Sequence, residues 1–324
     1  MSRRPSQQPS TVLITGGCGF VGTNLSRYLI DHGFDEVRVL DNLTTPFPFW
    51  IDTEKDHSRL PGIDLQTGDI RDRERVDKAV KGVNAVIHLA AHTSVVESLQ
   101  NPAVNWDINV GGTFNLLEAC RENGVERFIL ASSNAVAGEQ IPPIDEKKIP
   151  QPLSPYGASK LTGEALCSAY YHSFGIKTIS LRFANLYGPY SDHKTSVIAL
   201  FMQRISDQMP LTIYGDGNQT RDFVHVDDVC QAVYLSMVAE GSFGEVFQIA
   251  SGKETSVNEL VELLKEVTEK EIGIVYESER AGEIRRNYSD ISKARRIMGY
   301  EPEIELKDGL KGLWSNDQES LAAS

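Results

Sequence analysis

Short apolar runs rich in β-branched residues recur along the first half of the chain. They lie at 11–17, 36–41, 82–91, 127–133 and 177–183. Runs of this length and composition are typical of strands that are buried on both faces of a parallel sheet. The pattern therefore predicts five buried strands.

Segments of helix length separate these runs. They lie at 20–33, 101–124 and 154–175, and each ends at a glycine, as helices often do. Alternating strands and helices of this kind predict an α/β fold with a Rossmann-type doubly wound parallel sheet and right-handed crossovers.

The alternation loosens after about residue 183. The stretch "YGDGNQTRDF" is typical of turns, and 256–270 is typical of an amphipathic helix. We expect a first domain over 11–182, joined by a segment near 222–240, and a smaller C-terminal α/β lobe over 183–324. Residues 1–10 carry two arginines without a following apolar run, and we expect them to form a disordered tail.

Composition narrows the class of protein. A net charge of -13 argues against sequence-independent binding of nucleic acid, and no apolar stretch approaches the length of a membrane span. The four cysteines are scattered without a Cys-x-x-Cys pair, which disfavours a disulfide framework and a zinc site. We therefore expect a cytoplasmic protein without membrane or nucleic-acid partners.

A glycine-rich stretch, "TGGCGFVG", follows the first predicted strand and opens the first predicted helix. Gly16, Gly19 and Gly22 are spaced by three residues, and Asp41 ends the next strand about 20 residues later. Such glycines let a pyrophosphate approach a helix N-terminus, and the acid can accept a bond from a ribose 2′-hydroxyl. The pattern indicates an NAD site; the alternative is a turn that serves only close packing of the helix.

The stretch "SPYGASK" places Tyr156 and Lys160 four residues apart, just after Pro155. Proline is favoured in the first turn of a helix, and a spacing of four puts both side chains on one helical face. A nearby ammonium stabilises a phenolate, so the pair could act as a general base. The alternative is a tyrosine and a lysine on a solvated helix face.

Six motifs together carry a family resemblance: "TGGCGFVG", "HLAA", "ASSNAVAG", "SPYGASK", "LRFANLYGP" and "RDFVHVDD". They occur in the order found in extended short-chain dehydrogenase/reductases, and the chain resembles their nucleotide-sugar 4-epimerases, the UDP-galactose 4-epimerase type, over nearly its whole length. The resemblance implies that residues 11–182 bind NAD and that residues 183–324 mainly bind substrate.

The resemblance also implies catalytic roles for three residues. Tyr156 would be the base, Lys160 would hold the nicotinamide ribose and lower the tyrosine's pKa, and Ser133 would bond the reacting sugar hydroxyl. The family commonly has tyrosine where this chain has Ala137. A serine that merely ends a strand is the alternative for Ser133.

Two sets of binding residues follow from the same resemblance. The implied cofactor site comprises Gly16, Gly19, Phe20, Val21, Gly22, Asp41, Asn42, Asp69, Ile70, Leu89, Ala90, Ala91, Thr93, Tyr156 and Lys160. The implied substrate site comprises Ser94, Val95, Ser133, Asn134, Asn185, Arg221, Arg280, Glu283 and Asn287. For the two arginines the alternative is an ordinary surface or salt-bridged side chain.

The reaction implied is epimerisation of a nucleotide-diphosphate sugar, of the UDP-glucose or UDP-N-acetylglucosamine type, at carbon 4 through a transient 4-keto intermediate. Sugar dehydratases of this family carry an Asp-Glu pair where Asn134 and Ala135 stand, and glucuronate decarboxylases carry a glutamate in place of Ala135. The small Asn287 suggests that N-acetylated sugars also fit. In relatives the helices expected at 101–124 and 154–175 form a dimer interface, so we expect a homodimer.

Other readings stay open at this stage. They are a glucuronate epimerase or decarboxylase, another enzyme of 4-keto nucleotide-sugar chemistry, and a dinucleotide-sensing regulator that has lost the chemistry. His88, His92 and His225 have no metal-ligand spacing, and we expect no metal site.

Overall fold

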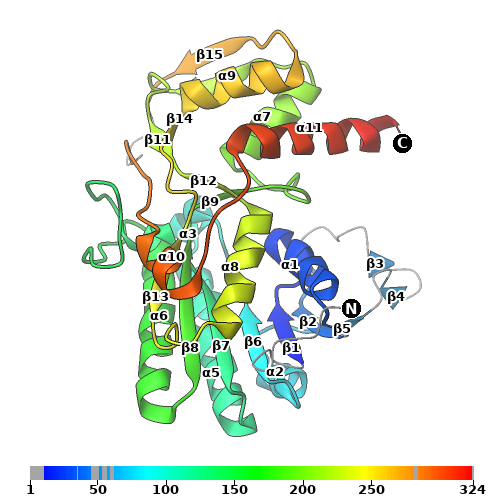
Figure 1. Ribbon diagram of the computed structural model, residues 1–324, viewed down its shortest axis with the longest axis vertical. Coiled ribbons are helices and arrows are strands. Elements are labelled where there is room, and N and C mark those ends of the chain that lie inside the picture. The colour runs from blue at the N-terminus through cyan, green and yellow to red at the C-terminus, as the bar shows by residue number, and fades with distance from the viewer. Residues whose placement is uncertain are drawn as a thin grey trace.

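A sheet of seven parallel strands lies at the centre of the computed structural model (Figure 1), which describes residues 11–34, 36–44, 51–52, 57–58, 62–279 and 284–322. In spatial order the strands are β13 (Val246–Ile249), β8 (Lys177–Phe183), β7 (Arg127–Ser133), β6 (Ala85–His88), β1 (Val12–Thr15), β2 (Val37–Asp41) and β5 (Ile63–Thr67). The expected doubly wound sheet is confirmed. The order reverses between β1 and β6, and ligands of such sheets bind outside the carboxyl ends of the strands at this point.

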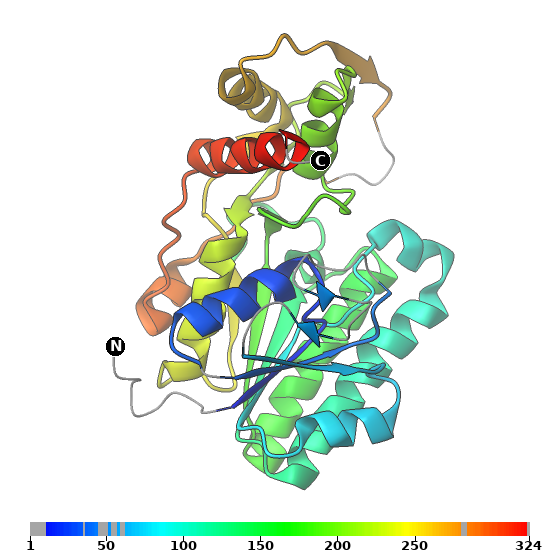
Figure 2. The same cartoon turned by 90° about the vertical axis from the view of Figure 1, so that its right-hand side faces the viewer.

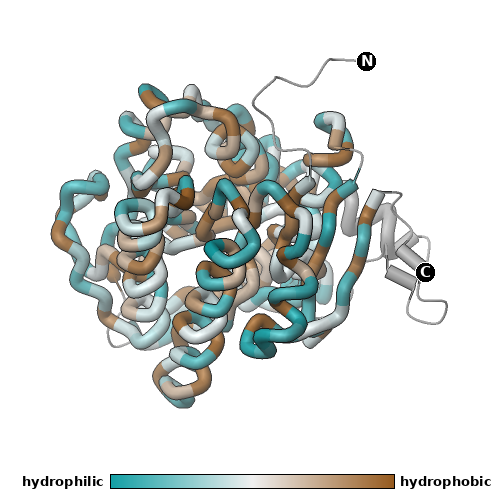
Figure 3. Tube along the Cα trace, turned by 90° about the horizontal axis from the view of Figure 1, so that it is seen from below, coloured by the Kyte–Doolittle hydropathy of each residue, from teal (hydrophilic) through white to brown (hydrophobic). Residues whose placement is uncertain are grey.

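Helices cover both faces of the sheet. The helices α1 (Phe20–Asp31), α8 (Val226–Val238) and α10 (Ser292–Met298) pack on one face, and α2 (Arg73–Val80), α5 (Gly112–Asn123) and α6 (Pro155–Phe174) pack on the other. Successive strand residues point to opposite faces, so Leu13 joins one core cluster and Ile14 joins the other. Figure 3 shows apolar and polar positions alternating along the outer helices.

The expected helix at 101–124 consists of three pieces. They are α4 (Pro102–Trp106), a π-helical turn (Asp107–Gly111) and α5, and the short α3 (Val95–Gln100) precedes them. Pro102 begins α4 because its missing N–H is not needed in a first turn. Single π turns inside helices occur frequently at functional sites, and this one contains Asn109.

A second lobe lies at one end of the central sheet (Figures 1 and 2). Its elements are β9 (Asn185–Tyr187), α7 (Val197–Ser206), β10 (Leu211–Tyr214), β11 (Thr220–Arg221), β12 (Phe223–His225), β14 (Thr255–Ser256), α9 (Val257–Thr268), β15 (Ile274–Glu277) and α11 (Leu306–Ala322). Ser256 and Glu259 form a capping box that fixes the start of α9, close to the expected residue 256. The boundary near residue 183 stays a prediction.

The chain enters this second lobe after β8 and returns to the central sheet as α8 and β13. It leaves again for β14, α9 and β15, and returns as α10 before α11. A short antiparallel pair is formed by β3 (Ile51–Asp52) and β4 (His57–Ser58). Within the described part of the chain, no helix is both long and apolar enough to cross a membrane.

Two glycines of α11 provide a test of the second lobe's packing. A Cβ at Gly309 would overlap the ring and hydroxyl of the fully buried Tyr187, whereas a Cβ at Gly312 would meet no atom within 4 Å. We expect Gly309→Ala to lower the free energy of unfolding by about 1–3 kcal/mol through overpacking. Gly312→Ala should raise it by about 0.5–1 kcal/mol, because alanine is the better helix former.

Urea unfolding of the two variants and the wild type measures both changes. Equal stabilisation by the two alanines would contradict the tight packing of α11 against Tyr187.

Candidate active site

The glycine-rich turn joins β1 to α1 at the point where the strand order reverses. Gly16 has a φ of +71°, and a Cβ there would lie 2.7 Å from the backbone of Ala90, the second residue after β6. A Cβ at Gly22 would overlap the carbonyl oxygen of Gly16. Both positions therefore require glycine for this turn to close.

The N-terminus of α1 is open to an anion. Gly19 is the N-cap residue, and no side chain caps the helix. The first backbone N–H groups of a helix have no partner within it and carry partial positive charge. Phe20 and Val21 begin the helix, so this end can receive a diphosphate.

Asp41 holds this turn from the end of β2. Its carboxylate accepts hydrogen bonds from the backbone N–H of Cys18 at 2.9 Å and of Leu43 at 2.8 Å. Burial raises the pKa of Asp41, and the two bonds act in the opposite direction. Each oxygen keeps a lone pair that can accept a bond from a ribose hydroxyl.

The neighbouring strand end brings Asn42 and Asp69 together. The Asn42 amide donates to Asp69 at 3.1 Å, and Arg71 bonds the same carboxylate and holds its pKa far below the usual range. Ile70 is buried against Gly112 of α5, so its side chain packs in the core and only its backbone is at the edge of the candidate site.

Leu89, Ala90 and Ala91 follow β6 and lie beside the glycine-rich turn. His88 precedes them and is enclosed by hydroxyls, with its ring nitrogens 2.8 Å from Thr15 Oγ1 and 2.9 Å from Thr113 Oγ1. Burial and the charge of Lys160 lower the pKa of His88 to about 3, so the ring is neutral.

The loop after β6 leads to α3. Ser94 caps this helix by accepting from the N–H of Glu97 at 3.1 Å, and the partly exposed Val95 begins it. Thr93 lies between this cap and His92, whose backbone is held by Asn109. The hydroxyl hydrogen of Ser94 stays available to a ligand, because capping uses only its oxygen.

Tyr156 and Lys160 lie in the first turns of α6, as the spacing predicts. Ser154 caps the helix by accepting from the N–H of Gly157 at 3.1 Å. The Lys160 side chain is 6% exposed, and its ammonium lies 6.0 Å from the centre of the Tyr156 ring. The pair therefore shares a face on which Lys160 is buried and Tyr156 is partly buried.

The Lys160 ammonium donates to the carbonyl of Ala131 at 2.8 Å and not to the phenol. Burial lowers the pKa of Lys160 to about 8, and the charge of Glu164 opposes this. Burial raises the pKa of Tyr156, and a hydrogen bond with Ser133 acts in the opposite direction. Lys160 is not among the groups that shift the Tyr156 pKa here, and the expected lowering of that pKa by Lys160 stays a prediction.

Ser133 ends β7 and is 9% exposed, and its hydroxyl oxygen accepts from the N–H of Ala135 at 3.1 Å. It is brought next to Tyr156, so the three candidate catalytic residues converge at the carboxyl ends of the strands.

Several supporting residues were not predicted from the sequence. Ser98 of α3 accepts from the backbone N–H of Tyr156 at 3.2 Å. Asn109 of the π turn donates to Ser159 at 2.9 Å, and Ser159 donates to the carbonyl of Tyr156 at 2.8 Å. No local sequence signal marks Ser98, whereas the π turn that carries Asn109 could not be told from a continuous helix.

A second unpredicted group lies one helical turn beyond Lys160. Glu164 forms a bidentate ion pair with Arg182, at 2.8 and 2.7 Å, and accepts from Ser132 at 2.5 Å. Both charged side chains are about 95% buried, with exposures of 5% and 4%. The spacing of four residues between Lys160 and Glu164 was the sequence signal that could have identified Glu164 as a neighbour of the lysine.

Two candidate substrate residues of the second lobe, Asn185 and Arg221, lie on β9 and β11. Asn185 begins β9 and lines a small cavity of about 40 Å³ with Ser196 and Phe223. The Arg221 guanidinium donates to the carbonyls of Thr220 at 2.7 Å and Ile284 at 2.8 Å.

Asn287 is 7% exposed, and its amide oxygen accepts from Asn134 at 3.4 Å. It is therefore brought beside Asn134, which directly follows Ser133 in the chain. Arg280 and Glu283 lie outside the residues that the structure describes.

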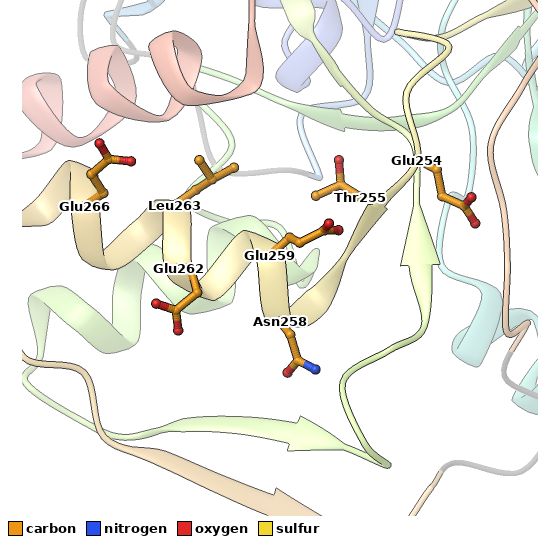
Figure 4. Close-up of a pocket in the computed structure, with 7 residues that line it drawn as sticks. All are labelled: Glu254, Thr255, Asn258, Glu259, Glu262, Leu263 and Glu266. Carbon is orange, nitrogen blue, oxygen red and sulfur yellow. The ribbon is translucent and has the colours of Figure 1, made fainter.

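A cavity of about 540 Å³ lies along α9, apart from the candidate site (Figure 4). Its lining is Glu254, Thr255, Asn258, Glu259, Glu262, Leu263 and Glu266, and it includes none of the candidate site residues. Four carboxylates would repel a diphosphate, so this cavity does not suit a nucleotide sugar. Over the described residues, no group of three or more His, Cys, Asp or Glu side chains is placed to hold a metal ion.

Comparison with known proteins assigns the family. Residues 12–250 match the model of the NAD dependent epimerase/dehydratase family. The chain belongs to this family. Its cofactor is therefore NAD, and the open N-terminus of α1, the glycines that a Cβ would fill and the Asp41 carboxylate all fit that group.

The chain is also similar to individual proteins of known or assigned activity. A putative UDP-glucose 4-epimerase of Methanocaldococcus jannaschii is 40% identical over 309 residues, which cover 93% of this chain and 96% of the relative. The crystal structure of UDP-glucose 4-epimerase from Thermotoga maritima with UDP-glucose has a TM-score of 0.88 and 35% identity, covering 96% of this chain and 99% of that one.

A third similar protein is the UDP-N-acetylglucosamine 4-epimerase of Methanobrevibacter ruminantium, solved with UDP-N-acetylmuramic acid. Its TM-score is 0.87 at 30% identity, and the match covers 96% of this chain and 99% of that one. The likeness thus extends over both lobes.

Proposed function

We propose that this NAD-dependent enzyme is an isomerase that inverts carbon 4 of a nucleotide-diphosphate sugar, with a UDP-hexose or UDP-N-acetylhexosamine as substrate. The observation that carries the proposal is the convergence of Ser133, Tyr156 and Lys160 at the carboxyl ends of the strands. Asn134 and Ala135 follow directly, so the extra acid and base that elimination of water needs are absent from these positions. Similarity to the two 4-epimerases described above supports the same reaction.

The mechanism uses few groups of the chain. Tyr156 accepts the proton of the sugar 4-hydroxyl. Ser133 forms hydrogen bonds with the same sugar oxygen and with the phenol oxygen of Tyr156. When bound, NAD supplies the acceptor and later the donor of the hydride at carbon 4. After the 4-keto sugar has rotated within the site, Tyr156 returns the proton to the same oxygen. The sugar therefore undergoes no net oxidation.

The 4-keto sugar must turn within the site while the nucleotide stays bound. This requires that most of the binding energy fall on the diphosphate and base, which do not react. Asn185 and Arg221 are the described candidates for the diphosphate, because amides and a guanidinium fork suit phosphate oxygens. From the resemblance alone, Arg280 is proposed as a second arginine for the diphosphate and Glu283 as a partner of a ribose hydroxyl.

The first experiment is to incubate the purified protein, without added cofactor, with UDP-glucose and separately with UDP-N-acetylglucosamine. We expect the galacto epimers to appear in proton NMR spectra, because NAD is regenerated in each turnover and stays bound. Tyr156→Phe should lower kcat by about 10²–10⁴-fold, since it removes the proton acceptor.

The control for this variant is its content of NAD and its affinity for UDP, which should both match the wild type. If the wild-type protein is shown to contain NAD and neither epimer appears in its reactions, 4-epimerisation of these sugars is contradicted. A Tyr156→Phe variant with full activity would exclude the assigned base.

Asn287 is proposed to admit N-acetylated sugars. It lies beside Asn134 at the candidate sugar site, and a tyrosine there would extend into the space of the acetyl group. We expect Asn287→Tyr to abolish turnover of UDP-N-acetylglucosamine while sparing UDP-glucose, and Asn287→Ser to spare both. NMR rates with each sugar measure the difference; equal loss of both activities in the tyrosine variant would refute the gate.

We also propose that the enzyme is a homodimer. Leu99 of α3, Trp106 of α4 and Phe114 of α5 are large apolar side chains with exposures of 61%, 53% and 47%. Apolar groups gathered on neighbouring helices of one surface are typical of a protein interface. Family resemblance makes a second copy of this chain the partner.

Sedimentation measures this association. The wild type should sediment as a dimer and Trp106→Lys as a monomer at micromolar concentration, while Lys307→Glu, on the exposed side of α11, should leave the dimer intact. A monomeric wild type would rule out the homodimer.

We place the enzyme in the cytoplasm. All four cysteines are free thiols buried in the described structure, which suits a reducing compartment.

A further inference from the structure

The carboxylate of Asp222 lies at a junction of the second lobe and the central sheet. Asp222 is fully buried between β11 and β12. One oxygen accepts from the backbone N–H and the hydroxyl of Ser251, at 2.8 and 2.6 Å. The other accepts from the N–H of Gly252 and of Ser289, both at 3.1 Å.

These bonds tie together segments that are far apart in the sequence. Ser251 and Gly252 follow β13, the edge strand of the central sheet. Ser289 lies two residues after Asn287. The carboxylate therefore fixes the segment that carries Asn287 against the end of a strand of the NAD-binding sheet.

The backbone of Asp222 extends the same junction. Its carbonyl oxygen accepts from the N–H of Asn185 at 3.0 Å, where β9 pairs with β12. Arg221 is its immediate neighbour in the chain. Three candidate substrate residues, on three segments, thus have their backbones positioned through one residue.

A buried carboxylate is costly unless hydrogen bonds compensate it. Burial raises the pKa of Asp222, and its bonds to Ser251, Ser289 and Gly252 act in the opposite direction. An apolar residue here would leave these four buried donors without an acceptor, so the carboxylate and the segments that it joins depend on one another.

We propose that Asp222 is a positioning residue that holds Asn185, Arg221 and Asn287 in register with the end of β13 and thereby sets the affinity for the nucleotide sugar. It does not contact the reacting atoms. The proposal rests on the proposed function for the roles of these three residues.

Asp222→Asn tests the proposal with a change of a few atoms. An amide has one accepting oxygen, so two of the four donors would face an NH₂ group in either orientation. We expect the Kd for UDP and the KM for the sugar nucleotide to rise about tenfold. The value of kcat should stay within about threefold of the wild type, and the NAD content should not change, because Tyr156 and the glycine-rich turn are untouched.

Asp228 provides the matched control. It is also buried, 3% exposed, and its carboxylate accepts from the backbone N–H of Glu303 at 2.8 Å and of Ile304 at 3.3 Å. These bonds join α8 to the segment before α11 and touch none of the three positioned residues. Asp228→Asn should therefore lower stability without a change in the Kd for UDP.

Ser251→Ala serves as a milder variant that is expected to fold even where Asp222→Asn does not. It removes one of the four bonds to the Asp222 carboxylate, at 2.6 Å, and the bond that the hydroxyl oxygen accepts from the N–H of Lys253 at 3.2 Å, so we expect a rise in the Kd for UDP of about threefold. Equal effects of the Asp222 and Asp228 variants on UDP affinity, or no effect of the Asp222 and Ser251 variants, would overturn the proposal.

Hydrogen exchange separates this failure from failure of the proposed function. In Asp222→Asn, exchange should accelerate at 185–187, 220–223 and 287–291, and in Asp228→Asn at 303–304. Unchanged exchange at the first three segments overturns the positioning role. If exchange accelerates as expected in Asp222→Asn but the wild type neither binds UDP nor turns over a sugar nucleotide, the proposed function is refuted, and with it the affinity role of Asp222.

Discussion

The burial of one ammonium group fixes the candidate active site. Lys160 is 6% exposed, and its Nζ donates to the carbonyl of Ala131 at 2.8 Å. An ammonium out of water needs such an acceptor, and it finds one only because α6 packs against the end of β7. The same packing places Tyr156, one turn earlier on α6, next to Ser133, two residues further along β7. The base and the hydrogen-bonding serine are therefore in register as a consequence of how one helix meets one strand.

The charges around Lys160 are arranged so that it can stay protonated. Burial lowers its pKa to about 8, and Glu164 on the same helical face acts in the opposite direction. Arg182 in turn neutralises Glu164 through two short bonds. His88 is kept neutral by burial and by the lysine's charge, so it adds no repulsion near pH 7. Lys160 is thus the positive group close to the phenol among the residues described above, and removal of Glu164 or Arg182 would disturb this balance of charges.

The sequence allowed us to predict the features that depend on residues close together in the chain. The five inner strands, the three helices and the glycine-rich turn follow from local composition, and the Tyr156 and Lys160 pair follows from helical spacing. The outer strands β5 and β13 were missed, because the half-exposed "IDLQT" and the four-residue "VFQI" resemble loops. Contacts such as Asn134 with Asn287, 153 residues apart, depend on how the two lobes meet, and a single sequence carries no record of that.

The Asp41 carboxylate links the expected preference for NAD over its 2′-phosphorylated analogue to the shape of the glycine-rich turn. A carboxylate at the end of β2 repels a 2′-phosphate, so a change of cofactor would require the loss of the Asp41 charge. Yet the same carboxylate accepts from Cys18 within the glycine-rich turn and from Leu43, which has a φ of +59°. A neutral replacement would leave at least one of these N–H groups without its acceptor and loosen the turn that receives the pyrophosphate. Cofactor choice and the shape of the cofactor site therefore depend on one side chain, and neither can change without the other.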